Sequence, residues 1–266
     1  MSSPADQEVW ASGDAYEPYV GRWSRPIARE FVQWLAAPPS RRWLDVGCGT
    51  GALCEVILEK ASPIELVAVD PSNGYIEFAR EHLADGRAQF LIGDAERIPV
   101  GSGAFDVSVA GLVLNFVSNP VRGVTEMARA VGRGCLVGAY VWDYAEGMQM
   151  MRHFWDAAAE LDPAARALDE GRRFELCNPD ALGALFETAG LREVEVRPID
   201  IPTRFRDFDD YWSPFLGGDG PAPSYAMSLD DEGRDALRER LGAALPTGAD
   251  GSIHLSARAW AVRGLK

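Results

Sequence analysis

Stretches of consecutive apolar residues alternate along the chain with segments whose apolar residues recur every three or four positions. The apolar runs cover residues 42–47, 64–70, 88–94, 105–114 and 134–142. The helical segments between them cover residues 52–61, 74–84 and 120–131. Short apolar runs separated by helices are typical of parallel strands with helices on both faces, and their crossovers are right-handed. The pattern predicts an α/β fold with a doubly wound, mostly parallel sheet.

The pattern changes after residue 142. Helices are predicted over residues 147–168, 178–190, 205–218 and 229–245, and alternating strands over residues 191–202 and 252–262. The stretch GGDGPAPSYAMS (residues 217–228) predicts a surface loop, because it is rich in glycine and proline. No linker is long enough to separate two domains. We expect a single domain with a helical lid over 1–40, a cofactor-binding half over 41–141 and a substrate half with helical additions over 142–266.

Charge and composition exclude several function classes. The formal net charge is −14 and no cluster of Lys and Arg interrupts it, so nucleic acid is not an expected partner. The four cysteines lack a C-x-x-C spacing and the chain has three histidines, so no metal site is expected. No apolar run reaches the roughly 20 residues that span a membrane. The first residues lack the features of a secretory signal, and we expect a cytoplasmic monomer or homodimer.

A glycine-rich loop follows the first predicted strand, in the stretch WLDVGCGTGA (residues 43–52). Its spacing fits G-x-G-x-x-A, which is typical of loops that hold a dinucleotide pyrophosphate. Asp45, however, precedes the first glycine by two residues, and a carboxylate there repels a pyrophosphate. Asp45 is also compatible with a simple cap of the turn.

Two further acids end the second and third predicted strands. Asp70 lies about 20 residues past the loop, where an acid accepts hydrogen bonds from ribose hydroxyls; it is equally suited to begin the next helix. Asp94 can accept the amino group of adenine, while the N–H of Ala95 donates to the ring. The carboxyl ends of parallel strands meet at one crevice. Three acids around that crevice favour a cationic adenosine ligand without phosphate, S-adenosylmethionine, over NAD.

Four motifs follow one another along the chain: WLDVGCGTG, VAVDPS, GDAERIPV and FDVSVAGLVLNFVSNP. In this respect the chain resembles class I S-adenosylmethionine-dependent methyltransferases, most closely the small-molecule branch that includes ubiquinone and menaquinone biosynthesis methyltransferases. The resemblance is specific over about residues 40–141 and weaker beyond. It implies a seven-stranded Rossmann-like sheet whose last strand is antiparallel.

The resemblance also implies roles for individual residues. Gly47, Cys48 and Gly49 would give the methionine part access to the backbone, and Asp45 would help to place its ammonium group. Asp70 would hold the ribose, with Pro71 and Ser72 beside the adenine. Asp94 and Ala95 would recognise the adenine edge, and the stretch from Ala110 to Leu112 would pass the sulfonium.

An N-terminal lid is a further expectation from the resemblance. Tyr16, Tyr19, Arg22 and Trp23 lie in the stretch that relatives fold over the cofactor. Arg22 could pair with the methionine carboxylate, and Tyr19 is a candidate for the substrate pocket. The alternative is that these aromatic residues only pack a peripheral helix.

The substrate side has weaker candidates. Asn115 lies where relatives often place His or Asn toward the substrate, although a turn would also accept it. Trp142 and Tyr144 follow the fifth strand. Met148, Met151 and Trp155 lie in the next predicted helix, where they either line a substrate pocket or pack in the core. His153 is a possible general base because its unperturbed pKa is near neutrality, or it is simply packed. Asn115, His153 and Tyr144 are the candidates for a catalytic role.

The predicted function is methyl transfer from S-adenosylmethionine to a small-molecule acceptor, by in-line displacement. DNA-base methylation is disfavoured, because the fourth strand ends in AGLVLNF without the N/D-P-P-Y/F tetrad. A protein of this fold that binds S-adenosylmethionine without methylating, such as a cyclase, a pericyclase or a regulatory binder, remains an alternative. A nicotinamide dehydrogenase is the third hypothesis.

Overall fold

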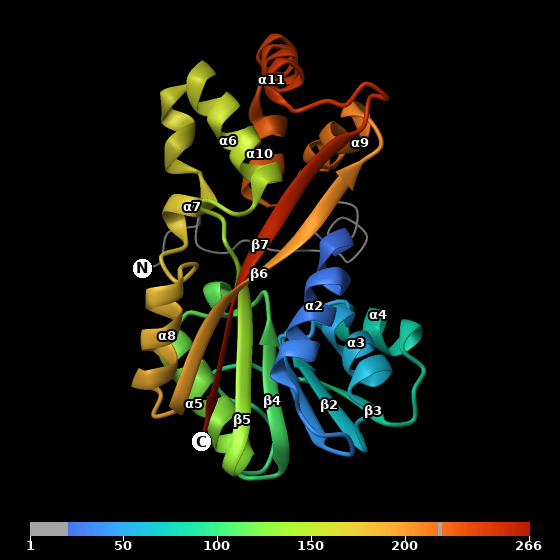
Figure 1. Ribbon diagram of the computed structural model, residues 1–266, viewed down its shortest axis with the longest axis vertical. Coiled ribbons are helices and arrows are strands. Elements are labelled where there is room, and N and C mark those ends of the chain that lie inside the picture. The colour runs from blue at the N-terminus through green and yellow to red at the C-terminus, as the bar shows by residue number, and fades with distance from the viewer. Residues whose placement is uncertain (1–20, 218–219) are drawn as a thin grey trace. The chain divides into compact units, whose positions relative to one another are not determined.

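The computed structural model describes residues 21–217 and 220–266, which form two compact units (Figure 1). The sheet unit comprises Trp23–Asp143, Glu175–Asp200 and Arg258–Lys266. The helical unit comprises Tyr144–Phe174, Ile201–Ala257 and the described residues before Trp23. That the chain acts as a single domain stays a prediction.

The strands lie in the order β3-β2-β1-β4-β5-β7-β6. The pairs among β1 (Arg42–Val46), β2 (Glu65–Asp70), β3 (Ala88–Ile92), β4 (Phe105–Gly111) and β5 (Val131–Trp142) are all parallel. β7 (Ile253–Leu265) runs antiparallel to β5, and β6 (Arg192–Phe205) lies beyond β7. This confirms the predicted mostly parallel, seven-stranded sheet with an antiparallel last strand. The strand order reverses between β1 and β4, which is where doubly wound sheets bind ligands.

Helices connect the strands of the sheet unit (Figure 1). They are α2 (Arg22–Leu35), α3 (Ala52–Lys60), α4 (Asn73–His82), α5 (Pro120–Ala130) and α8 (Pro179–Thr188). Side chains cap several of their N-termini, as Ser72 does for α4 and Asn178 does for α8. Gly190 after α8 has φ 85°, in the left-handed region that favours glycine at the end of a helix. Ser72, rather than Asp70, caps the helix after β2.

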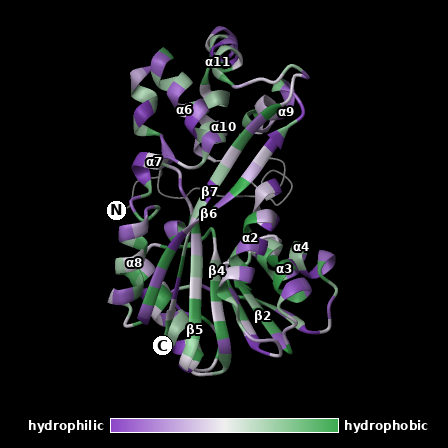
Figure 2. Ribbon diagram, in the orientation of Figure 1, coloured by the Kyte–Doolittle hydropathy of each residue, from purple (hydrophilic) through white to green (hydrophobic). Residues whose placement is uncertain are grey.

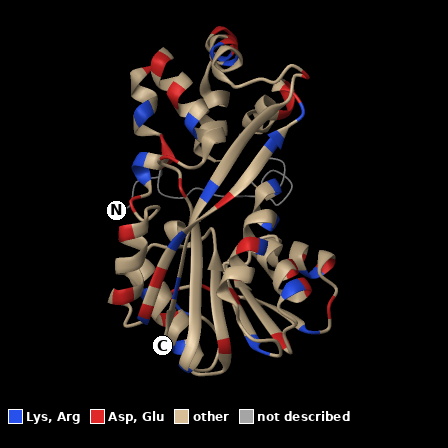
Figure 3. Ribbon diagram, viewed as in Figure 1, with Lys and Arg blue, Asp and Glu red and all other residues tan. Residues whose placement is uncertain are grey.

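The core of the sheet unit lies on the central strands. Leu44, Val46, Val67 and Val109 are at most 4% exposed, and Figure 2 shows hydrophobic residues along these strands. β5 carries a single charged residue, Arg133, while charged residues gather on helices and on β6 (Figure 3). The apolar runs of the sequence are therefore the doubly covered strands.

The helical unit packs around an aromatic core. Its elements are α6 (Gln149–Leu161), η4 (Pro163–Ala167), α7 (Glu170–Arg173), α9 (Phe208–Trp212), η5 (Ser213–Leu216), α10 (Pro221–Ser228) and α11 (Asp231–Ala244). Phe154 stacks on Phe215 with ring centroids 4.4 Å apart. The Tyr211 hydroxyl donates to the Met150 carbonyl at 2.8 Å. Met148, Met151 and Trp155 are almost fully buried, which favours core packing over a pocket wall.

Two helices predicted after residue 142 have other bounds in the structure. The helix expected over 147–168 ends at Leu161, because Asp162 is extended and its carboxylate caps η4. The helix expected over 205–218 begins at Phe208, since Asp207 caps it, and it continues as η5.

The surface loop expected over 217–228 is wrong for its greater part. Residues 221–228 form α10, and Ala222, Tyr225 and Ala226 are buried. Pro221 and Pro223 fall in the first turn, where the helix needs no backbone N–H donors. In the described ranges, no helix is both long enough and apolar enough to cross a membrane.

Candidate cofactor site

The glycine-rich loop folds tightly against the neighbouring strands. The N–H groups of Gly47 and Cys48 donate to the Val69 carbonyl at 2.7 and 3.1 Å. Gly47 and Gly49 have φ angles of 74° and 52°, in the left-handed region. A Cβ on Gly47 would meet Val113 atoms at 2.5–2.9 Å, whereas a Cβ on Gly49 would have no neighbour within 4 Å. The loop is therefore packed on one side and open at Gly49.

Asp70 ties this loop to the start of α4. Its Oδ2 accepts from the Gly49 N–H, and its Oδ1 accepts from the Ser72 N–H, both at 2.9 Å. The residue is 6% exposed, and burial raises the pKa of its carboxyl. Each carboxylate oxygen has a second lone pair, so Asp70 could accept ligand hydroxyls as well. Pro71 beside it is exposed and Ser72 is partly exposed.

Asp45 is fully buried at the end of β1. Its Oδ2 accepts a hydrogen bond from the Cys54 thiol of α3 at 3.0 Å, while its Oδ1 has no partner among the described residues. Burial raises the pKa of Asp45 to about 7; the Cys54 hydrogen bond lowers it, and the charge of Asp70 raises it further. Direct contact of Asp45 with an ammonium group stays a prediction, because the side chain has no exposed surface.

The raised pKa of Asp45 predicts a pH-dependent stability term. The unfolded carboxyl ionises near 3.8 and the folded one near 7, so the folded state holds an extra proton between these values. Stability from this group therefore decreases as pH rises from about 4 to 7. Asp45→Asn should gain stability relative to the parent over that interval in urea denaturation. A difference between the two proteins that does not change with pH would contradict this assignment.

The turn after β3 holds Asp94 and Ala95. Asp94 is exposed, and its Oδ1 accepts from the Glu96 N–H at 2.7 Å. Glu96 in turn accepts from the Asn119 N–H at 2.8 Å, and its carbonyl accepts from Arg122 at 2.8 Å. This ties the turn to the start of α5 and leaves the Asp94 carboxylate accessible.

The exits of β4 and β5 carry buried donors without acceptors. Ala110 is buried in β4, and Leu112 after it has φ 60°, an unusual angle for a residue with a side chain. Its N–H donates to the Tyr140 carbonyl at 2.8 Å, which holds the exit against β5. In the described part of the chain, neither the Asn115 Nδ2 nor the Trp142 Nε1 has a hydrogen-bond partner. Both atoms are buried donors that a ligand oxygen could satisfy.

Other predicted residues belong to the helical unit. Arg22 pairs with Asp210 at 3.2 Å and lies over the Phe205 ring, so its guanidinium is already engaged. Tyr144 is buried against Phe174. His153 is half-buried, and burial lowers its pKa although Asp156 opposes the shift. Their ligand roles stay predictions. Trp23 is buried in α2 of the sheet unit, whereas Tyr16 and Tyr19 lie outside the described residues.

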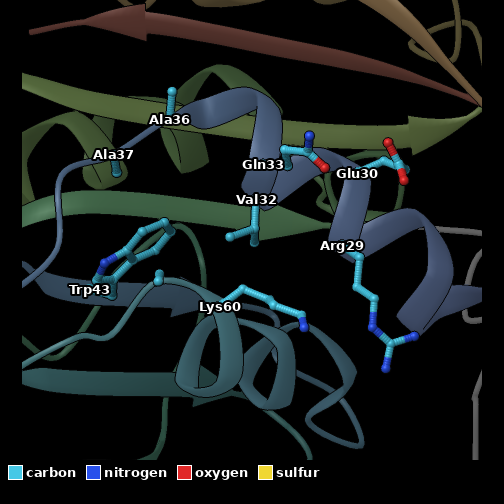
Figure 4. Close-up of a pocket in the computed structure, with 9 residues that line it drawn as sticks. Arg29, Glu30, Val32, Gln33, Ala36, Ala37, Trp43 and Lys60 are labelled. Carbon is cyan, nitrogen blue, oxygen red and sulfur yellow. The ribbon is translucent and has the colours of Figure 1, made fainter.

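A surface pocket of about 500 Å³ in the sheet unit contains none of the predicted site residues. Figure 4 shows Lys60 extending from α3 below Val32 of α2, with Trp43 beside it. Glu59 pairs with both basic residues of the lining, Lys60 at 3.0 Å and Arg29 at 3.9 Å. Within residues 21–217 and 220–266, no three His, Cys, Asp or Glu side chains gather as metal ligands.

A family model described as a methyltransferase domain matches residues 44–137. This range contains the glycine-rich loop, Asp70, Asp94 and the β4 exit. Residues 44–137 are therefore a methyltransferase domain of the class I S-adenosylmethionine-dependent type.

Curated relatives match about half of the chain. A methyltransferase of Mycobacterium tuberculosis is 35% identical over 129 residues, which are 48% of this chain and 49% of the relative. The demethylmenaquinone methyltransferase of Renibacterium salmoninarum is 30% identical over 113 residues, 42% of this chain and 44% of the relative. The chain thus spans about half the length of the curated relatives it matches.

A solved structure has the same fold as this chain over most of its length. It is a putative methyltransferase from an antibiotic biosynthesis pathway of Anabaena variabilis, with 18% identity and a TM-score of 0.62. The match covers 91% of this chain and 97% of that one. The likeness concerns the fold.

Sequence reasoning missed two residues that pack against the predicted site residues. Cys54 is the hydrogen-bond partner of Asp45, and Val113 closes on Gly47. Cys54 lies on the inward face of α3 among buried neighbours, so its position in the helix indicates burial. Nothing in the sequence indicates which side chain it would meet.

Proposed function

We propose that this methyltransferase transfers a methyl group from S-adenosylmethionine to a small-molecule acceptor, with the sheet unit holding the cofactor. The observation that carries the proposal is the position of the glycine-rich loop and Asp70 at the carboxyl ends of β1 and β2, next to the unsatisfied donors after β4 and β5. Ligands of doubly wound sheets bind at this edge.

The residues at this edge fit a phosphate-free cationic cofactor. The acids of the sheet unit that we assign to it are Asp70 and Asp94, with Asp45 buried behind the loop at a pKa of about 7. None of its assigned residues there is a Lys or Arg that would pair with a pyrophosphate. The open space at Gly49 allows a ligand to approach the backbone. Bound S-adenosylmethionine would supply an electrophilic methyl group. Asp70 would orient the ribose, and the loop would position the methionine part.

The buried donors after β4 and β5 favour an acceptor molecule with an oxygen near the reacting atom. The Asn115 Nδ2 and the Trp142 Nε1 would each donate to such an oxygen and fix its orientation. The acidic net charge of −14 disfavours nucleic-acid acceptors. The name of one relative, a demethylmenaquinone methyltransferase, indicates that it acts on a small molecule.

Replacing Trp142 by phenylalanine tests the acceptor site. The change removes a buried N–H that has no partner among the described residues, and the smaller ring leaves a cavity that lowers stability, so kcat/KM is measured on folded protein. We expect kcat/KM for the acceptor to fall by about tenfold, the effect of roughly 1.4 kcal/mol, with unchanged affinity for S-adenosylhomocysteine. Trp43→Phe is the matched control, because its Nε1 is also buried and without a partner but lies at the start of β1. Equal effects of both variants on kcat/KM would contradict the role of Trp142.

Methyl transfer itself is tested with S-adenosylmethionine labelled in its methyl group and a panel of small acceptors. Labelled product together with S-adenosylhomocysteine supports the proposal. Cofactor binding without S-adenosylhomocysteine across the panel would favour the non-methylating alternative. Calorimetric binding of NAD but not of S-adenosylhomocysteine would overturn the assignment of the ligand.

A further inference from the structure

A cavity of about 300 Å³ lies within the helical unit, lined by α6, η4 and α7. It contains none of the residues that the proposed function uses. Its charged lining residues are Arg152, Asp156, Arg166, Asp169 and Arg172. Three of these five residues are arginines, although the net charge of the chain is −14.

The wall of this cavity is held in place by Asp169. Its carboxylate is almost buried and accepts from both terminal nitrogens of Arg152, with Nη1 to Oδ2 at 2.9 Å. Oδ1 also accepts from the Gly171 N–H at 2.8 Å, which caps α7. Gly171 packs so closely that a Cβ there would lie 2.8 Å from the Tyr144 carbonyl oxygen. Arg152 is therefore fixed before any ligand binds.

The other two guanidinium groups have no partner. Neither Arg166 nor Arg172 makes a side-chain hydrogen bond or ion pair in the described part of the chain, and both residues are exposed. Asp156 shares the lining but lies within ion-pair distance of neither of them. The Nε of Arg152 is buried and also lacks an acceptor in the described residues. The cavity lining therefore has more arginines than acids, and more N–H donors than the described residues supply with acceptors.

The pocket of Figure 4 provides a contrast within the same chain. There, Glu59 pairs with both Arg29 and Lys60, and a second acid, Glu30, also lines the pocket (Figure 4). At the α6–α7 cavity, Asp169 pairs with Arg152, and among the described residues Arg166 and Arg172 are left without an ion pair, with Asp156 as the second acid of the lining. Guanidinium groups bind phosphate and carboxylate through paired, charge-assisted hydrogen bonds.

We propose that the α6–α7 cavity is an anion site that binds a phosphate or carboxylate group through Arg166 and Arg172, with Arg152 as a fixed third donor. The cavity volume is at the lower end of ligand pockets, which extend from about 300 to 1,000 Å³, so the ligand part that it holds is small. The site does not depend on the proposed methyl transfer, because none of its residues belongs to the sheet unit.

Calorimetric titration of the full chain at low ionic strength tests this proposal, with inorganic phosphate, glycerol phosphate and malonate as probes and chloride for comparison. We expect phosphate or malonate to bind and chloride not to bind. Tighter binding of phosphate than of malonate would identify a phosphate site, and the reverse a carboxylate site. Tighter binding of glycerol phosphate than of phosphate would indicate that the group belongs to a larger organic molecule.

Two double variants make the test specific. Arg166→Gln/Arg172→Gln should weaken the binding of the anion by at least about tenfold, as expected for lost charge-assisted hydrogen bonds. Arg41→Gln/Arg133→Gln removes the same charge from two exposed arginines outside the cavity and should leave binding unchanged. Equal weakening by both pairs, or no binding of any probe to the parent protein, would overturn the proposal. Affinity for S-adenosylhomocysteine should be the same in all variants, so the two proposals can fail separately.

Discussion

Gly47→Ala is expected to lower the free energy of unfolding by about 2–5 kcal/mol. Two costs combine: the left-handed backbone at φ 74° disfavours a side chain by about 1–2 kcal/mol, and overpacking adds about 1–3 kcal/mol. The new methyl group would lie 2.9 Å from the Cβ of Val113, an atom that no rotamer change can move. Urea denaturation measures the loss.

Two other glycines calibrate this prediction. Gly86→Ala meets no atom within 4 Å and has an ordinary φ angle, so it should have little effect. Gly49→Ala meets no atom but has φ 52°, so it should cost about 1 kcal/mol. Its methyl group would enter the open side of the loop, where the proposed function predicts weaker binding of S-adenosylhomocysteine. A Gly47→Ala protein as stable as Gly86→Ala would show that Val113 does not close on the loop.

Asp70→Ala should weaken the binding of S-adenosylhomocysteine by about 1–3 kcal/mol, since it leaves hydrogen-bonding groups without partners. The change removes the acceptor that the proposed function assigns to the ribose hydroxyls, and also the acceptor that fixes the N–H groups of Gly49 and Ser72. Both losses act on the same loop. Calorimetry gives the affinity, and denaturation gives the accompanying loss of stability.

Asp106→Ala is the matched control for this loss. Asp106 also accepts a backbone N–H, from Arg42 at 2.9 Å, but it lies near the start of β4, at the opposite ends of the strands. It should lower stability while leaving the affinity for S-adenosylhomocysteine unchanged. If both variants bind S-adenosylhomocysteine equally well, Asp70 does not hold the ribose.

The sequence predicts the sheet well because its signal is local. Each of the first five strands is an apolar run that ends near a glycine, an acid or a polar turn, and the matching helices follow within a few residues. Asp45, Asp70 and Asp94 could be placed at one edge from topology alone, since all three end parallel strands. The order of the strands cannot be predicted from the apolar runs themselves; it is the order of the doubly wound fold that they indicate.

Other features depend on contacts between distant residues. The pairing of Asp45 with Cys54 and the closure of Val113 on Gly47 leave no periodic signal. The helix α10 was missed because glycine and proline favour loops in a local reading, although burial of Tyr225 and Ala226 overrides that preference. Arg22 looked available for a ligand until its pairing with Asp210, 188 positions away, was known.

The chain leaves and re-enters the sheet unit at neighbouring points. It leaves after Asp143 and again after Asp200, and it returns at Arg258. The Asp143 N–H donates to the Arg258 carbonyl at 2.9 Å, and the Arg258 Nε donates to Asp200 at 2.9 Å. Residues 144–174 and 201–257 are therefore two insertions into one scaffold. Short turns or a different pair of inserts could replace them without breaking a central strand, so evolution or design could exchange them while the cofactor loops stay intact.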